Sequence, residues 1–196
     1  MTKTRLEAFS DGVFAIVITL LILNIHIPEV DYAHLKTALI GIIPNLISYV
    51  MSFLVIGLYW VSHHRSFLLV KKTDSIFLWM NTILLLCISF MPFPTSLLGQ
   101  FPFTKIPLII YGANLIAANS IGFIMLIYLK YHPELWANEM THFNIRKQIP
   151  IYIGVNFCYL IAILLAGTCP KISYGIYIFI LLFLIVVYQS KSLIKE

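Results

Sequence analysis

Long, almost uninterrupted runs of apolar residues are the feature that most restricts how this chain can fold. Cut at prolines and charged residues, the sequence yields six such segments, at approximately 6–27, 35–62, 75–97, 106–131, 149–167 and 172–188. A membrane-spanning α-helix needs about 20 apolar residues, and the first segment would be roughly 33 Å long as a helix. Apolar residues make up 60% of the chain and charged residues 11%. The sequence therefore predicts an all-α integral membrane protein, with six transmembrane helices in one domain over residues 1–196.

The composition argues against several other classes of protein. The spans leave no room for a soluble catalytic domain, and the chain has no nucleophile elbow, HExxH motif, phosphate-binding glycine loop or paired intramembrane carboxylate. We therefore expect neither an enzyme nor a cofactor. The net charge is +5, but the basic residues form no stripe or tail, so no nucleic-acid partner is expected. The odd number of cysteines, Cys87, Cys158 and Cys169, indicates free thiols.

Lysine and arginine are distributed unevenly between the two sides of the predicted membrane protein. With six spans, one side collects ten basic residues and the other collects three. The larger set is Lys3, Arg5, Arg65, Lys71, Lys72, Lys130, Arg146, Lys147, Lys191 and Lys195, and the smaller set is Lys36, Lys105 and Lys171. Cytoplasmic loops carry an excess of Lys and Arg, so we expect both termini in the cytoplasm.

The first segment contains a carboxylate, Asp11, more than one turn inside a predicted spanning helix. Charged side chains at such positions are costly and usually face protein or water. Our hypothesis is that Asp11 and other polar groups at a similar depth satisfy one another within the protomer, because an unpaired buried carboxylate is expensive. The predicted network comprises Arg5, Ser10, Asp11, His63, His64, Arg65, Trp79 and Asn81. In the alternative interpretation, Asp11 caps the helix or reaches the membrane interface, and its role is structural in both.

The adjacent histidines, His63 and His64, could suggest a metal site. Neighbouring residues on a helix point about 100° apart, and no third ligand stands three or four positions away. The sequence therefore favours a structural role for them, and we expect no metal site.

A narrow apolar stripe lies roughly opposite Ser10 and Asp11 on the first predicted helix. Its residues are Ile16, Leu20, Leu23 and Ile27, at the spacing i, i+4, i+7 and i+11. Most apolar residues on a membrane helix face lipid or a neighbouring helix. Taken alone, the stripe therefore favours packing over a role in a pore.

Three motifs resemble the signature of the transmembrane protein 175 family of potassium channels. The first reads Arg5-x-x-x-Phe9-Ser10-Asp11-Gly12-Val13-Phe14-Ala15-Ile16. The second reads Tyr59-Trp60-x-x-His63-His64-Arg65, followed by Asp74 and Leu78-Trp79-Met80-Asn81. The third reads Ser89-Phe90-x-Pro92-Phe93-Pro94-Thr95. Together they cover the first three predicted helices, whereas the last three helices match the family only in number and hydrophobicity.

The resemblance implies a potassium-selective channel in the plasma membrane. Family members with one six-helix repeat form tetramers, so this chain would be one subunit of a homotetramer whose four first helices line the pore. Carried over by position, Ile16, Leu20 and Leu23 would form successive apolar rings, with Ile16 nearest the cytoplasm, and Thr19 would offer a hydroxyl to a passing ion. Potassium sheds its hydration shell more readily than sodium, so a narrow aliphatic ring would act as a sieve.

Two other interpretations stay open at this point. A secondary transporter or a proton-conducting protein is the main alternative, although we see no pair of interrupted helices around a midplane site, and Asp11 points away from the stripe. An intramembrane enzyme or a non-conducting scaffold is a third possibility. It predicts that polar replacement of Ile16 would leave ion flux unchanged.

Overall fold

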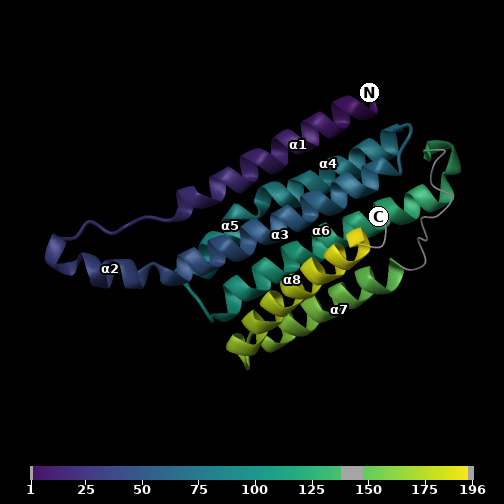
Figure 1. Ribbon diagram of the computed structural model, residues 1–196. Helices are drawn as coiled ribbons and strands as arrows, with labels where there is room; N and C mark the ends of the chain where they lie inside the picture. Colours follow the sequence, from purple (N-terminus) through teal and green to yellow (C-terminus); the bar gives the residue numbers. More distant parts are fainter. Residues whose placement is uncertain (1, 138–147, 194–196) are drawn as a thin grey trace.

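The computed structural model is a bundle of long helices and describes residues 2–137 and 148–193 (Figure 1). The α-helices are α1 (Lys3–Leu20), α2 (Leu35–Gly41), α3 (Ile43–Leu68), α4 (Ser75–Phe90), α5 (Pro92–Gln100), α6 (Lys105–Tyr131), α7 (Ile149–Leu165) and α8 (Pro170–Leu193). Three 3-10 turns, η1 (Leu21–Asn24), η2 (Tyr32–His34) and η3 (Pro133–Leu135), lie between them. In these ranges the only β pairing is a single bridge between Val70 and Trp136. The all-α prediction is therefore confirmed.

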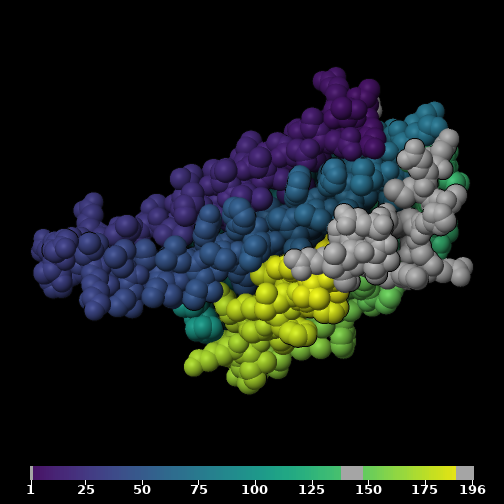
Figure 2. Space-filling model, viewed as in Figure 1, coloured from purple at the N-terminus to yellow at the C-terminus, as the bar shows by residue number. Residues whose placement is uncertain are grey.

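The long helices lie side by side with nearly aligned axes (Figure 1). Helix α1 forms one edge and packs on α3 and α4, while α6, α7 and α8 form the other side of the bundle. The segment after α1, together with α2, projects beyond the rest of the molecule (Figure 2). Fully buried aromatic side chains, including Phe14, Phe67, Phe77 and Tyr111, fill the space between the helices.

Within residues 2–137 and 148–193, five helical stretches are long and apolar enough to cross a membrane. They are Lys3–Asn24, Ile43–Leu68, Ser75–Gln100, Lys105–Tyr131 and Pro170–Tyr188. The sixth expected span is the shorter helix α7, which has 17 residues. Seventeen residues are the lower limit for a spanning helix, because the hydrocarbon core is about 30 Å thick.

Prolines decide where several helices begin and end. The segment expected at 35–62 is divided at Ile42, and Pro44 occupies the first turn of α3, where its missing N–H costs nothing. Helix α3 then continues to Leu68, so His63, His64 and Arg65 lie inside the helix instead of ending it. The segment expected at 75–97 is divided at Met91, ahead of Pro92.

The α-helical part of α1 ends earlier than the sequence predicts. It ends at Leu20, continues as the 3-10 turn η1 to Asn24, and leaves Ile27 in a non-helical segment. Pro28 disfavours the helical conformation for Ile27, and the β-branched Ile25 and Ile27 add little helix propensity. The helical spacing that would place Ile27 on the Ile16 stripe is therefore broken.

Asp74 is the N-cap residue of α4. Its Oδ1 accepts a hydrogen bond from the backbone N–H of Phe77 at 2.8 Å, and its Oδ2 accepts one from the hydroxyl of Tyr128 on α6. Desolvation raises the pKa of the Asp74 carboxyl, but the two hydrogen bonds outweigh it and hold the pKa below its ordinary value. The cap therefore also ties the start of α4 to α6.

The predicted connection at 132–148 falls mostly outside the described residues. Its basic residues Arg146 and Lys147 lie there, as does Lys195 near the C-terminus. The part that is described, up to Ala137, is held by backbone hydrogen bonds to the α3–α4 connection. Lys71 N–H donates to the Leu135 carbonyl at 2.7 Å, and Ala137 N–H donates to the Leu69 carbonyl at 2.9 Å.

Candidate pore helix and the residues that hold it

Helix α1 has one buried face and one exposed face. Ser10, Phe14 and Val17 are at most 3% exposed and lie against α3 and α4. On the other side, Ile16 is 60% exposed and Leu20 is 42% exposed. A helix in lipid commonly has an exposed aliphatic face. In α1, however, the opposite face makes polar contacts with α3 and α4. The bundle thus holds α1 by one side and presents Ile16 and Leu20 on the other.

Three polar side chains form a buried chain of hydrogen bonds between α1, α4 and α3. Ser10 Oγ donates its single proton to the Leu6 carbonyl at 2.8 Å. The same oxygen therefore acts as the acceptor for Asn81 Nδ2, at 3.0 Å. Asn81 thereby turns its Oδ1 toward His63 Nε2, at 2.8 Å. Because Oδ1 can only accept, Nε2 of His63 carries a proton and donates it. This chain sets the rotation of α1 relative to α3 and α4.

Aromatic rings hold His63 in this orientation. Its ring stacks on Phe67 of the same helix, with centroids 4.2 Å apart, and lies 5.5 Å from the ring of Phe14 on α1. His63 is 6% exposed and Asn81 is fully buried. Since buried polar groups without partners are costly, all members of the chain depend on one another.

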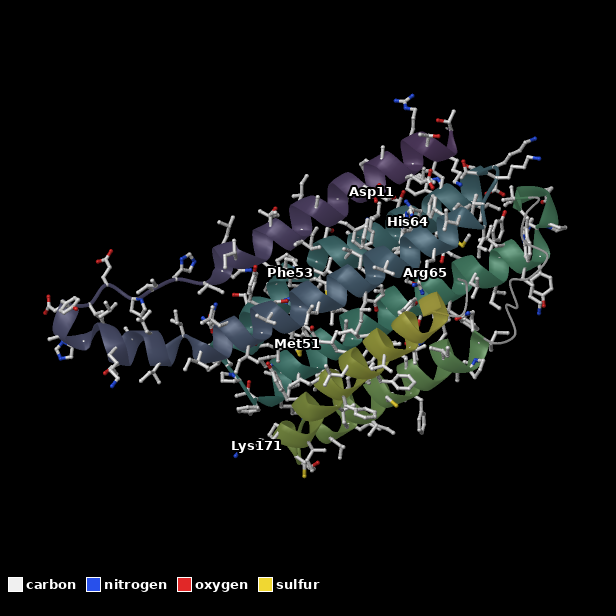
Figure 3. All side chains as sticks on the ribbon, in the orientation of Figure 1. Asp11, Met51, Phe53, His64, Arg65 and Lys171 are labelled. Atoms are coloured by element: carbon white, nitrogen blue, oxygen red, sulfur yellow. The ribbon has the colours of Figure 1, made fainter. Side chains whose placement is uncertain are left out.

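Asp11 does not belong to this buried chain. It is exposed on the protomer, and its Oδ1 accepts a hydrogen bond from the indole N–H of Trp60 on α3 at 2.9 Å. The ring of Trp60 stacks in turn on His64, with centroids 6.0 Å apart. Figure 3 shows Asp11 and His64 on neighbouring stretches of α1 and α3. Successive residues on a helix point about 100° apart, so Ser10 faces the core while Asp11 does not.

Sequence reasoning missed Trp60 as the partner of Asp11. A signal was present, because Trp60 precedes His64 by four residues and therefore lies on the same side of α3. The predicted network included an indole, but that of Trp79, which is 64% exposed on α4.

The remaining members of the predicted network lie elsewhere. Arg65 faces α8, where Nη2 donates to the Tyr188 carbonyl at 3.3 Å and the guanidinium lies 5.1 Å from the Tyr188 ring centroid (Figure 3). Trp79 is 64% exposed on α4. Arg5 is also exposed, and it precedes Ile16 by eleven residues, three helical turns, so it lies on the same side of α1 as the stripe.

Thr19 turns its hydroxyl back to its own helix. Its Oγ1 lies 2.8 Å from the Ile16 carbonyl and 3.1 Å from the Ala15 carbonyl. The hydroxyl proton is therefore used within α1, while the oxygen lone pairs stay available. Leu23, which is 63% exposed, belongs to η1 and not to the regular helix.

The far end of α1 is anchored by a residue that the sequence did not single out. Asn24, the last residue of η1, donates from Nδ2 to the carbonyl of Pro92 at 3.3 Å. Pro92 begins α5, directly after the break that follows α4. The helix is thus tied near both ends, at Ser10 and at Asn24, with Ile16 and Leu20 between the two ties. Within the described residues, no group of three His, Cys, Asp or Glu side chains is placed to hold a metal ion.

Comparison with known proteins gives these features a family context. Residues 5–92 match the family model described as endosomal/lysosomal potassium channel TMEM175. A potassium channel of Chryseobacterium sp. strain P1-3 is 36% identical over 180 residues, which cover 90% of this chain and 89% of the relative. The chain belongs to the TMEM175 family. This is a family of ion channels and not of enzymes. The residues that match the family model include most of α1 and all of α3 and α4.

The fold is shared with a solved TMEM175 structure. The crystal structure of a lysosomal potassium-selective channel TMEM175 homolog from Chamaesiphon minutus superimposes with a TM-score of 0.81 at 30% identity, covering 94% of this chain and 96% of that one. Human TMEM175, named an endosomal/lysosomal proton channel, is 30% identical over 166 residues, 79% of this chain but 31% of the human protein. With several apolar helices of spanning length, this TMEM175 family member is a multi-pass membrane protein.

Proposed function

We propose that the chain is one subunit of a potassium-selective channel, in which α1 of four identical subunits surrounds the ion path. One observation carries the proposal. Helix α1 is tied to its own bundle by a buried polar face, while Ile16 and Leu20 on the opposite face stay exposed. A helix held in this way keeps a defined rotation, and several copies around an axis enclose a narrow path. The potassium-channel name of the Chryseobacterium relative supports the choice of ion.

Ile16 would form the narrowest ring and act by dehydration. An aliphatic ring offers an ion no oxygen in place of water, so the ion must shed part of its hydration shell to pass. Potassium holds water less tightly than sodium and therefore meets the lower barrier. Leu20 and Leu23 would add further apolar rings, and the lone pairs of Thr19 would assist at the edge of the path.

Asp11 supports assembly into an oligomer. On the isolated protomer this carboxylate is exposed on a helix that crosses the membrane, where it accepts a hydrogen bond from the Trp60 indole. Charged groups in spanning segments face protein or water, not lipid. We infer that a neighbouring subunit covers Asp11 and Trp60 in the tetramer.

The same proposal includes a sixth crossing by α7 and both termini in the cytoplasm of a plasma-membrane channel. Helix α7 packs against both α6 and α8 and runs alongside them (Figure 1). A crossing there keeps ten of the thirteen basic residues on one side of the membrane.

Proton conduction is the second candidate function, favoured by the name of the human relative. A proton path needs titratable groups or water along the conduit. In this chain Asp11 lies about 140° around α1 from Ile16, and His63 is buried behind the helix. The geometry therefore favours potassium.

Reversal potentials of the purified protein in planar bilayers, with potassium on one side and sodium on the other, test the proposal. The wild-type potential should shift toward the potassium equilibrium potential, and Ile16→Asn should weaken that shift by hydrating the ring. The matched control is Ile22→Asn, because Ile22 is also exposed but lies off the stripe. Absence of current, or a current that follows only the pH gradient, would overturn the potassium-channel proposal.

A further inference from the structure

The chain passes from α4 to α5 through residues 87–92, the α4–α5 joint. Pro92 has no backbone N–H to offer the carbonyl of Ile88, four residues before it. The N–H of Met91 bonds to that carbonyl instead, at 3.1 Å. In a regular α-helix the same N–H would serve the carbonyl of Cys87. The break therefore leaves the Cys87 carbonyl without its usual donor, at a depth where an unpaired backbone group is costly.

Asn114 on α6 supplies the missing donor. Its Nδ2 lies 3.0 Å from the Cys87 carbonyl and 3.0 Å from Sδ of Met91. An amide nitrogen carries two protons, so it can serve both acceptors at once. Asn114 is 8% exposed and Met91 is fully buried. The amide thus fixes the last turn of α4, and the residue next to Pro92, against α6.

The end of the pore-helix candidate is attached to the same joint. The Pro92 carbonyl, directly after Met91, accepts the hydrogen bond from Asn24 Nδ2 at 3.3 Å. Leu23 precedes Asn24 in the 3-10 turn η1, whose hydrogen bonds have poorer geometry than those of an α-helix. Beyond η1, residues 25–31 have no regular structure. The position of Leu23 therefore depends on the bond that Asn24 makes to the joint.

We propose that the α4–α5 joint sets the position of Leu23 in the ion path, with Asn24 and Asn114 as positioning residues. Asn24 fastens η1 to the joint, and Asn114 holds the joint against α6. Both act through Leu23, which is 63% exposed. The effect on ion selection rests on the proposed channel function, whereas the mechanical link from Asn114 to η1 does not.

Hydrogen–deuterium exchange of the full-length protein in lipid nanodiscs tests the mechanical link without any ion current. The amides of η1 should exchange faster in Asn24→Ala than in wild type, because η1 loses its tie to the joint. They should also exchange faster in Asn114→Ala, because the Pro92 carbonyl is then held less firmly. Unchanged exchange of η1 in Asn114→Ala would overturn the link.

Asn119→Ala on the same helix is the matched control. Its Nδ2 also serves two acceptors, the Tyr152 carbonyl at 3.1 Å and Asn156 Oδ1 at 2.8 Å. Both acceptors belong to α7, on the far side of the bundle from α1 (Figure 1). This variant should leave the exchange of η1 unchanged, and a rise equal to that of Asn114→Ala would also overturn the link.

Reversal potentials with potassium on one side and sodium on the other test the role in the ion path. Asn24→Ala and Asn114→Ala should conduct with potentials closer to zero than wild type, and Asn119→Ala should keep the wild-type potential. In a Leu23→Ala background, Asn24→Ala should cause no further shift, since its effect passes through Leu23. A reversal potential does not depend on how much protein folds, so a loss of stability alone would not move it.

Two results would overturn the positioning role in a protein that conducts. One is a wild-type potential in both Asn24→Ala and Asn114→Ala, and the other is a further shift when Asn24→Ala is added to Leu23→Ala. Faster exchange of η1 in a protein that conducts no potassium would leave the mechanical link supported and count against the channel proposal alone.

Discussion

At the scale of single residues, the buried amide of Asn81 connects the three helices that hold the pore-helix candidate. Its nitrogen donates to Ser10 on α1 and its oxygen accepts from His63 on α3. No other described side chain contacts both of these groups through hydrogen bonds. Its loss therefore removes the donor to Ser10 Oγ and the acceptor of His63 Nε2, while Ser10 keeps its bond to the Leu6 carbonyl.

We expect Asn81→Ala to lower the free energy of unfolding by about 1–3 kcal/mol, because both Ser10 and His63 lose a hydrogen bond in a buried position. Thermal unfolding of the purified protein in detergent measures this. The control is Thr82→Ala, whose hydroxyl donates only to the Leu78 carbonyl within α4. Equal midpoints for the two variants would show that the Asn81 hydrogen bonds do not stabilise the bundle.

At the scale of elements, α3 and α5 approach each other closely at Gly99. A Cβ added there would lie 2.6 Å from Oδ1 and 2.9 Å from Cα of Asn45. Small residues commonly permit such close approach of membrane helices. The second contact is with backbone, so a side-chain rotation cannot relieve it.

Gly99→Ala should therefore destabilise the protein by about 1–3 kcal/mol, because α3 and α5 must move apart. Gly154→Ala on α7 is the matched control. A Cβ at Gly154 meets no other atom within 4 Å, and alanine is the better helix former, so this variant should be neutral or slightly stabilising. Unfolding midpoints that fall in the opposite order would contradict the close packing of α3 on α5.

At the scale of the whole molecule, the number of times the chain crosses the membrane decides on which side of it the turn between α7 and α8 lies. In the described part of the chain, five helical stretches have the length and hydropathy of a span, and α7 is shorter. With six crossings and cytoplasmic termini, the α7–α8 turn is extracellular. Five crossings without α7 would put the same turn in the cytoplasm.

Cys169 lies exposed in that turn, whereas Cys87 and Cys158 are half-buried within helices. In intact cells, a membrane-impermeant maleimide should label the wild-type chain at Cys169. Cys169→Ser should remove the label, which identifies the site. Labelling that appears only after the cells are permeabilised would contradict the sixth crossing or the cytoplasmic termini.

The sequence by itself determined that this is an α-helical membrane protein, that α1 carries a polar face and an apolar face, and that its motifs are those of the TMEM175 family. Hydropathy, helical period and local motifs are properties of neighbouring residues in the chain, so they can be read without coordinates.

Only the tertiary structure decided which polar groups meet. Ser10 and Asp11 are adjacent in the sequence, yet one bonds to Asn81 on α4 and the other to Trp60 on α3. Arg65, two residues after His63, faces α8. These pairings depend on how each helix is rotated and placed against its neighbours, which is set by packing of the buried faces over the whole bundle.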